Sequence, residues 1–452
     1  MATTTQIPGM RNFLGLKNVS AIREVGFLQF LMDGWREYGD FYFIELGSSG
    51  MHVVINPDDV QKILLKNAAN YTKLSSYNNT RQYLMGNGLV TSIGDEWLWQ
   101  RRLLAPFFTP RGVAHYTTLF IQETQAMLAR WQQHDTLQPL NISDEMVSLT
   151  LSIILKVIFN VESDDRLTLI QEDVETLFKF AGQRRRSVIK TPLWLPTENN
   201  QQYQAARQRL NSYIEELVAK RHATPKAQWS NDILSKILSA EDDASGRSFS
   251  QQDIIDQCIT FFVAGHETTA RMMTFALYAL SQNPDVQTQL IAEIDAKVAG
   301  DVPTVDELKQ MPYTLRTLKE TLRLYPSAAF YPRDVIDDDT LSGYAVGAGT
   351  ALMLFPYGTH RHPDYWQDPL TFDPDRFSPE REATRHPFAY APFSGGKRIC
   401  IGNNFSLLEG QIILATLYKH VIPQLVTGHD PQIMATATLA PSAGMPMHIN
   451  WR

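Results

Sequence analysis

The chain has 452 residues, of which 44% are hydrophobic and 20% are charged. This composition is typical of a folded globular protein and excludes a disordered or collagen-like chain. The formal net charge of −7 argues against a general nucleic-acid-binding protein, which normally carries a basic excess or stripe. We interpret the short basic cluster at 184–186 as a solvated helix face.

The number of cysteines and the lengths of the apolar stretches indicate in which cellular compartment the protein works. Only Cys258 and Cys400 occur, too few for a disulfide framework, so nothing in the sequence asks for an oxidising compartment. No stretch reaches the roughly 18 to 20 apolar residues that span a bilayer. We therefore expect a cytoplasmic protein without a membrane anchor.

Hydrophobic periodicity and turn signals predict a mainly helical chain with a smaller β-rich part. In chain order we expect an amphipathic helix at 27–40, hairpin strands at 41–46 and 51–56, mostly helix over 57–238, one long helix between Ser250 and Asn283, strands and turns after Pro326, a helix after Gly402, and short strands with loops from Leu425 onward.

The sequence shows no internal repeat and no linker poor enough in apolar residues to separate two folding units. The β-rich parts come from both ends of the chain, whereas the helices occupy its middle. We therefore expect residues 1–452 to form a single mainly α domain with an intertwined β region.

Cys400 stands in a glycine-rich stretch just before a helix with a broad apolar stripe. A helix N-terminus favours an anion, and therefore a thiolate. Glycines at 395, 396 and 402 keep the loop slim enough for a large flat group to lie over it. A thiolate with a planar partner is the arrangement of a cysteine-ligated haem. The alternative, a buried free cysteine, is our interpretation of Cys258.

The stretch Phe393-x-x-Gly396-x-Arg398-x-Cys400-x-Gly402 fixes five residue types over ten positions. This pattern resembles the haem-ligand signature of the cytochrome P-450 family of haem-thiolate monooxygenases. The resemblance implies the fold of that family, a haem b cofactor and Cys400 as the iron ligand, with Phe393 and Arg398 beside the haem.

The long helix has one polar interruption, "AGHETT" at 264–269. Gly265 lets a ligand approach the backbone, and the Thr268 hydroxyl can bond the carbonyl of Ala264, which loosens the helix. The alternative is a satisfied core threonine beside an acid that reaches solvent. The segment looks like the family's oxygen-binding helix, in which Glu267 and Thr268 match the acid–alcohol pair that relays protons.

The segment "KETLRLYP" places Glu320 and Arg323 one helical turn apart, which by itself is weak evidence. "FDPDRF" follows about fifty residues later. The resemblance implies that Glu320, Arg323 and Arg376 form a buried structural triad that supports the haem loop. Asp375 stands where many members have Glu, a mild departure.

Four further positions match those that bind the haem carboxylates in the family. Trp97 and Arg101 lie one turn apart on a helix, and an indole N–H and a guanidinium both suit a propionate. Arg333 and Arg398 match other propionate-binding positions. Each arginine alone would more often be an ordinary surface residue.

The resemblance implies a monooxygenase that inserts one oxygen atom from O2 into an organic substrate. We expect a monomer that receives electrons from a separate ferredoxin or flavodoxin with its NAD(P)H-dependent reductase, with Lys397 and Arg102 offering positive charge near Cys400. A haem-thiolate enzyme that uses peroxide is one alternative. A haem-based sensor without turnover is another.

The sequence indicates only the general class of the substrate, through the residues expected to line its pocket. The expected pocket residues are apolar and predict a lipid-like substrate, such as a fatty-acid-like or terpenoid molecule. Core packing is the alternative for each of them. The expected lining consists of Phe261, Phe262, Ala264, Ala328 and Phe330, with the loop around Tyr83 and the tail at 441–446 as further walls.

Overall fold

The computed structural model describes residues 6–47, 49–73, 75–135, 137–161, 166–186, 191–243, 245–435 and 437–452. Its chain divides into two compact units, each made of separate stretches. Unit 1 contains Met1–Thr72, Ala114–Leu149 and Glu267–Arg452, and unit 2 contains Lys73–Val113 and Thr150–His266. Within the described residues, no helix is long and apolar enough to cross a membrane.

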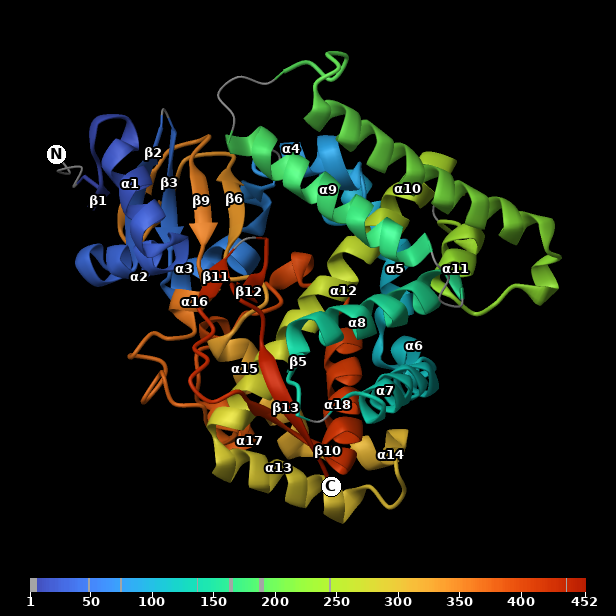
Figure 1. Ribbon diagram of the computed structural model, residues 1–452. Coiled ribbons are helices and arrows are strands. Elements are labelled where there is room, and N and C mark those ends of the chain that lie inside the picture. Colours follow the sequence, from blue (N-terminus) through green and yellow to red (C-terminus); the bar gives the residue numbers. More distant parts are fainter. Residues whose placement is uncertain are drawn as a thin grey trace. The chain divides into compact units, whose positions relative to one another are not determined.

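Unit 1 holds a six-stranded sheet in the order β1-β2-β3-β9-β6-β4 (Figure 1). Its strands are β1 (Gly9–Met10), β2 (Phe41–Leu46), β3 (Ser49–Val54), β4 (Tyr71–Thr72), β6 (Tyr331–Val335) and β9 (Ala351–Leu354). The predicted hairpin is confirmed, because β2 and β3 pair antiparallel with Phe41 opposite Val54. The strand β3 then pairs parallel with β9, with His52 opposite Leu352, which joins segments far apart in the sequence in one sheet.

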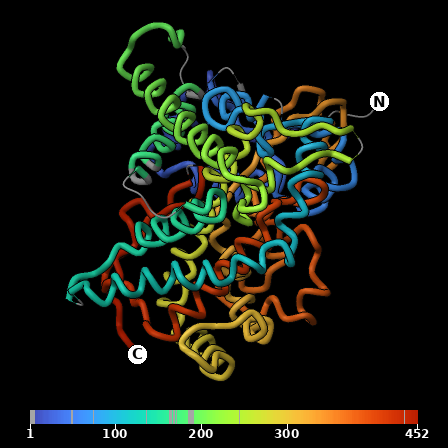
Figure 2. Tube along the Cα trace, turned by 90° about the vertical axis from the view of Figure 1, so that its right-hand side faces the viewer, coloured from blue at the N-terminus to red at the C-terminus, as the bar shows by residue number. Residues whose placement is uncertain are grey.

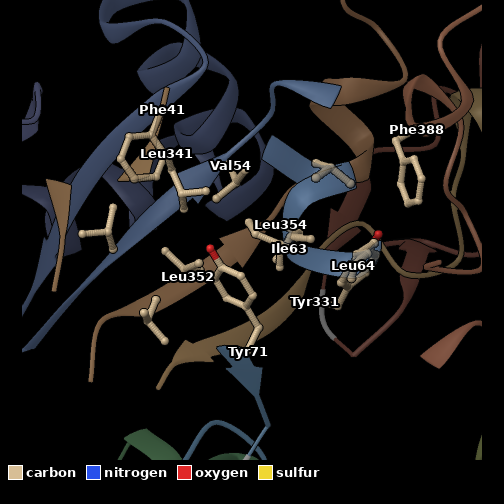
Figure 3. Packing of buried hydrophobic residues seen from close by; sticks show 13 residues of the cluster. Phe41, Val54, Ile63, Leu64, Tyr71, Tyr331, Leu341, Leu352, Leu354 and Phe388 are labelled. Atoms are coloured by element: carbon tan, nitrogen blue, oxygen red, sulfur yellow. The ribbon is translucent and has the colours of Figure 1, made fainter. Parts of the chain in front are cut away.

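One face of this sheet carries a buried apolar cluster (Figure 3). Leu352 and Leu354 alternate along β9 and point to the same face, as the two-residue period of a strand requires. Leu64 and Phe388 come from segments outside the sheet and close the cluster. The sheet therefore holds together parts of the chain that are far apart in sequence.

Smaller sheets complete the β-rich part of unit 1. Their strands are β5 (Leu140–Asn141), β10 (Val421–Leu425) and β13 (Pro446–Trp451) in one sheet, β7 (Asp339–Leu341) with β8 (Tyr344–Val346), and β11 (Ile433–Ala435) with β12 (Leu439–Pro441). Within unit 1, residues 6–72 lie at the top in both views and the C-terminus lies at the bottom (Figures 1 and 2).

The remainder of unit 1 is helical, and α18 packs against α7, α13 and α15. Its helices are α1 (Leu16–Val25), α2 (Phe27–Tyr38), α3 (Pro57–Gln61), α7 (Thr117–Gln132), α13 (Pro284–Lys297), α14 (Val305–Leu308), α15 (Pro312–Leu324), α16 (Pro356–Thr359), α17 (Pro379–Ala383) and α18 (Asn403–His420). The predicted helices after residue 27 and after Gly402 are therefore confirmed.

Unit 2 is mainly helical, and α9 and α10 lie side by side in it (Figure 1). Its helices are α4 (Asn78–Thr80), α5 (Gly94–Leu104), α9 (Arg166–Arg186), α10 (Glu198–Ala223) and α11 (Ile233–Ser239), while α6 (Pro110–Ala114), α8 (Ile142–Phe159) and α12 (Gln251–Gln282) contribute residues to both units. Short 3-10 or π turns are η1 (Phe13–Gly15), η2 (Lys62–Lys66), η3 (Ala68–Asn70), η4 (Arg81–Met85), η5 (Ala105–Phe108), η6 (Lys226–Gln228), η7 (Pro374–Phe377), η8 (Pro387–Ala389) and η9 (Gly396–Arg398).

The basic cluster in α9 differs from our expectation. The Arg184 side chain is buried rather than solvated, and its guanidinium lies 5.4 Å from the ring centre of Tyr83 and 4.9 Å from that of Phe180. It also donates to Asn200. Aromatic faces attract a cation, so these rings draw Arg184 inward. A count of charges along the chain does not reveal such partners.

The long helix α12 begins and ends where the sequence predicts. The Ser250 hydroxyl accepts from the Asp253 N–H at 3.2 Å, and the Asp253 carboxylate accepts from the Ser250 N–H at 3.0 Å. This reciprocal cap satisfies two backbone donors at the helix start. Pro284 begins the next helix directly after Asn283.

The cluster around β9 yields the first prediction. Leu354 is fully buried, so Leu354→Ala removes packed methyl groups and leaves a cavity, and it should lower the free energy of unfolding by about 2 to 5 kcal/mol. The matched control is Leu370→Ala, because Leu370 is 75% exposed and its loss should cost no more than about 0.5 kcal/mol. Urea unfolding measures both, and equal losses would contradict the assignment of this core.

Candidate functional site

The loop before α18 presents Cys400 at the protein surface. The Cys400 N–H donates to the Phe393 carbonyl at 2.9 Å, which closes the loop, and its side chain is exposed. The helix α18 begins three residues later, at Asn403. Cys258, by contrast, is fully buried, and burial raises the pKa of its thiol, so its interpretation as a packing residue is confirmed.

Gly396 fixes the path of this loop. Its φ is +61°, and a Cβ there would lie 1.9 Å from the Leu64 carbonyl oxygen. At Gly395, a Cβ would meet the Phe388 ring at 2.6 Å. The backbone of the cysteine loop therefore lies directly against two members of the buried cluster, and only glycine allows that approach.

A buried arginine lies beside the same loop. Arg333, on β6, is only 3% exposed, and its Nη2 lies 3.4 Å from the Ser394 hydroxyl oxygen. Its Nη1 donates to the Pro332 carbonyl. The Arg333 guanidinium thus lies against Ser394, the residue that follows Phe393 in the cysteine loop.

The predicted triad residues meet in the interior of unit 1. Two hydrogen bonds of 2.7 Å join the Arg323 guanidinium to the Glu320 carboxylate, and Arg376 Nε lies 3.4 Å from the same carboxylate. All three side chains are buried. Because a buried charge is costly without partners, these contacts tie α15 to η7, against which it packs.

His360 connects this cluster to the cysteine loop, a role that sequence reasoning missed. Its carbonyl accepts from Arg323 Nη1 at 2.9 Å, and its Nε2 accepts from the Ala391 N–H at 2.9 Å. Complete burial and the neighbouring arginines lower the pKa of His360 to about 3. The imidazole therefore stays neutral and can accept at Nε2. No local pattern signals this role.

The acid of α12 has partners within unit 1. The Thr438 hydroxyl donates to Glu267 Oε1 at 2.8 Å, and Arg271 Nη2 lies 3.5 Å from the same oxygen. The Glu267 side chain is 22% exposed. The carbonyl of Thr268 accepts from the Ser327 hydroxyl at 2.7 Å. The bond from Thr268 to the Ala264 carbonyl stays a prediction.

Gly265 serves close packing between helices. A Cβ there would lie 2.7 Å from the Ile154 side chain, so α8 occupies the space that a larger residue would need. The hydroxyl of Thr150, also on α8, donates to the His266 carbonyl at 2.9 Å. Contact of Gly265 with a ligand stays a prediction.

The remaining predicted site residues are divided between the two units. In unit 2, Trp97, Phe261 and Phe262 are buried, and Arg101 and Ala264 are half-buried. In unit 1, Ala328, Phe330, Phe393 and Arg398 are half-buried. Phe330 packs its ring edge-on against Phe27, and Phe261 packs against Phe108, so core packing explains part of their burial.

Two surface cations, Arg102 and Lys397, were predicted to contribute to docking of a redox partner, and they differ in their environment. Arg102 donates to both carboxylate oxygens of Asp242, at 2.8 and 2.7 Å, so its charge is already paired. Lys397 is exposed within η9. Of the two cations that the sequence suggested for docking of a redox partner near Cys400, Lys397 therefore offers the more available positive charge.

Glu409 is a buried acid on α18 that the sequence analysis did not single out. It is 1% exposed, and its Oε2 has no hydrogen-bond partner among the residues that the structure describes. Burial raises the pKa of Glu409 to about 8, although a hydrogen bond with Thr269 works in the other direction. The side chain therefore holds a proton at neutral pH. The signal in the sequence was a single acid within an apolar helical stripe.

Comparisons with known proteins agree with this architecture. The family model for cytochrome P450 matches residues 7–442. Cyclooctatin synthase of Streptomyces melanosporofaciens is 32% identical over 409 residues, which cover 88% of this chain and 87% of that protein. Cyclooctat-9-en-7-ol 5-monooxygenase of the same organism is 31% identical over 418 residues, covering 92% and 88%. A crystal structure of the cytochrome P450DA heme domain matches with a TM-score of 0.90 at 26% identity, covering 99% of this chain and 98% of that one.

The chain belongs to the cytochrome P450 family. It has the cytochrome P450 fold, is a monooxygenase and binds haem b. The residues around Cys400 fit such a group. The thiol is exposed, and the nearest atom to a Cβ built at Gly402 is Cys400 Sγ, at 3.9 Å, so glycine leaves the space beside the sulfur open.

The loop geometry predicts the effect of one added methyl group. Gly396→Ala places a Cβ against the Leu64 carbonyl and should lower both the haem content and the free energy of unfolding, the latter by about 2 kcal/mol or more. Gly349→Ala is the control, because Gly349 has a φ of +79° but open space around it, so it carries only the strain of about 1 kcal/mol. The ratio of haem to protein absorbance and urea unfolding test this. Equal losses in the two variants would refute the close contact.

Glu409 predicts a pH dependence of stability. An unfolded glutamate ionises near pH 4.3, whereas the folded protein retains the proton up to a pKa of about 8. The folded state then binds more protons, so this group makes stability fall as pH rises between these values, by at most about 1.4 kcal/mol per pH unit. Glu409→Gln cannot ionise and should lose that slope.

Urea unfolding at pH 5.5, 6.5 and 7.5 compares this variant with the parent. Glu382→Gln is the control, because Glu382 is a largely exposed partner of Lys319 and should leave the slope unchanged. If Glu409→Gln follows the parent at all three pH values, Glu409 is ionised in the folded protein.

Proposed function

We propose that Cys400 is the residue that would hold the haem iron through its sulfur. The observation that carries the proposal is an exposed thiol on a loop whose path requires glycine, three residues before a helix and beside a buried arginine. The helix N-terminus favours the thiolate. Trp97, Arg101, Arg333 and Arg398 hold the propionates.

Bound haem supplies the oxygen chemistry that places one atom of O2 in a C–H bond and releases the other as water, at the cost of two electrons and two protons. Two residues of α12 transfer the protons that this reaction needs. Glu267 takes up and releases protons at its carboxylate, and the Thr268 hydroxyl passes them on. The contacts of Glu267 with Thr438 and Arg271 fix the position of its carboxylate, which supports its role as a proton donor and acceptor.

The substrate we propose is a hydrophobic, terpenoid-like molecule rather than a linear fatty acid. A relative at 31% identity is named for its action on cyclooctat-9-en-7-ol, an unsaturated alcohol. Phe261, Phe262, Ala264, Ala328 and Phe330 line the site that takes it. Their apolar side chains support burial of a hydrocarbon skeleton.

Electrons come from a separate ferredoxin or flavodoxin with its NAD(P)H-dependent reductase. The exposed Lys397 supports docking near Cys400. We further propose that the chain acts as one haem domain, as a monomer, and in the cytosol, where cysteines remain reduced.

The first test is the visible spectrum of the dithionite-reduced protein under carbon monoxide. We expect a Soret band shifted far to the red, which reports thiolate ligation, and its loss in Cys400→Ser. Cys258→Ser is the control and should keep the band. An ordinary haem–carbon monoxide band in the parent would overturn the assignment of Cys400.

The second part of the test addresses the substrate and the rival functions. Geranylgeraniol and lauric acid are titrated into the oxidised protein, and we expect the larger spectral shift with the terpenoid alcohol. Turnover with NADPH and a surrogate ferredoxin pair should give a hydroxylated product. Product only with added peroxide would favour a peroxide-using enzyme, and no product with either would favour a sensor.

A further inference from the structure

Thr438 touches the acid of α12 from a distant part of the chain. It lies directly before β12, and it is 7% exposed. Its hydroxyl donates to Glu267 Oε1 at 2.8 Å, across a separation of 171 residues. A hydroxyl that donates to a carboxylate makes a strong, directional hydrogen bond. The C-terminal segment from Leu425 onward, called the tail below, therefore influences the orientation of the Glu267 carboxylate.

The next residue of the tail acts on the alcohol of the pair. The Leu439 N–H donates to the Ser327 carbonyl at 3.0 Å, and the Ser327 hydroxyl donates to the Thr268 carbonyl at 2.7 Å. Two consecutive residues of the tail thus hold both members of the acid–alcohol pair, one directly and one through Ser327.

The second partner of Glu267 meets the same oxygen. Arg271 Nη2 lies 3.5 Å from Oε1, while its Nη1 donates to the Ser143 hydroxyl at 2.7 Å. Both contacts of Glu267 are thus made at Oε1, and Oε2 has no hydrogen bond among the residues that the structure describes. These contacts thus hold Oε1 and leave Oε2 without a hydrogen bond within the described part of the chain.

We propose that Thr438 is a positioning residue of the proton relay. It fixes Glu267 Oε1 and so leaves Oε2 as the oxygen that carries protons. This rests on the proposed function, in which Glu267 and Thr268 form that relay. The shorter contact, from Thr438, orients the carboxylate, whereas the 3.5 Å contact from Arg271 contributes mainly charge.

The contact itself is tested by a double-mutant cycle on urea unfolding. Thr438→Val has nearly the same shape but lacks the hydroxyl, and it should lower the urea midpoint. The loss should shrink by at least half when Glu267 is already replaced in Glu267→Ala. Thr438→Ser keeps the hydroxyl and should restore most of the midpoint. Thr427→Val, an exposed threonine of the same tail, is the matched control.

The effect on the relay is tested during NADPH oxidation without added substrate, with a surrogate ferredoxin and its reductase. Dioxygen then leaves as hydrogen peroxide, which takes two electrons and two protons, or as water, which takes four of each. A misoriented acid delivers protons poorly, so the peroxide share of the O2 consumed should rise at least twofold in Thr438→Val. It should stay at the parent value in Thr438→Ser and Thr427→Val.

The outcomes separate the two proposals. A rise of equal size when Thr438→Val is added to Glu267→Ala would overturn the proposal, because the effect would not pass through Glu267. An unchanged peroxide share in Thr438→Val would also overturn it, even with a positive unfolding cycle. If the parent lacks the far-red carbon monoxide band, the proposed function fails first and the relay proposal fails with it, while the unfolding cycle still decides whether the contact exists.

Discussion

Arg323 donates all five of its N–H groups inside the protein. Two go to the Glu320 carboxylate, and the others go to the backbone carbonyls of His360, Pro369 and Thr371. A fully buried guanidinium is tolerated only when its donors are satisfied. The segment that supplies these carbonyls therefore has little freedom to shift, because each displacement would leave a donor unpaired.

The cysteine loop inherits this rigidity from two sides. On one side, His360 receives the Arg323 bond at its carbonyl and binds the Ala391 N–H at its ring. On the other side, Gly396 lies against the Leu64 carbonyl. The backbone around Cys400 is thus held by buried polar and apolar contacts, while the sulfur itself stays accessible. A reactive ligand on a rigid support is what precise cofactor binding requires.

The sequence could predict features that depend on neighbouring residues. The ends of α12, the hairpin of β2 and β3, and the glycine-rich loop before α18 all follow from short-range rules, and each is present. Glu320, Arg323 and Arg376 also lie together, and their support of the haem loop stays a prediction.

Features set by distant partners could not be predicted. His360, Glu409 and Thr438 owe their roles to residues far away in the chain, and no spacing rule reports such contacts. Arg184 was predicted to be solvated but is buried for the same reason, because its aromatic partner Tyr83 lies about a hundred residues earlier. Tertiary contacts decide these roles, and local patterns carry no record of them.

The pairing of β3 with β9 has a consequence for synthesis of the protein. Near these strands, the Thr359 hydroxyl donates to the Ile55 carbonyl across 304 residues. At roughly 5 to 20 residues per second, the N-terminal hairpin waits about 15 to 60 seconds on the ribosome for its sheet partner. During that time β3 has an open edge, which can pair with other chains. The order of synthesis therefore leaves this strand edge exposed to association with other chains until residues 351–354 are made.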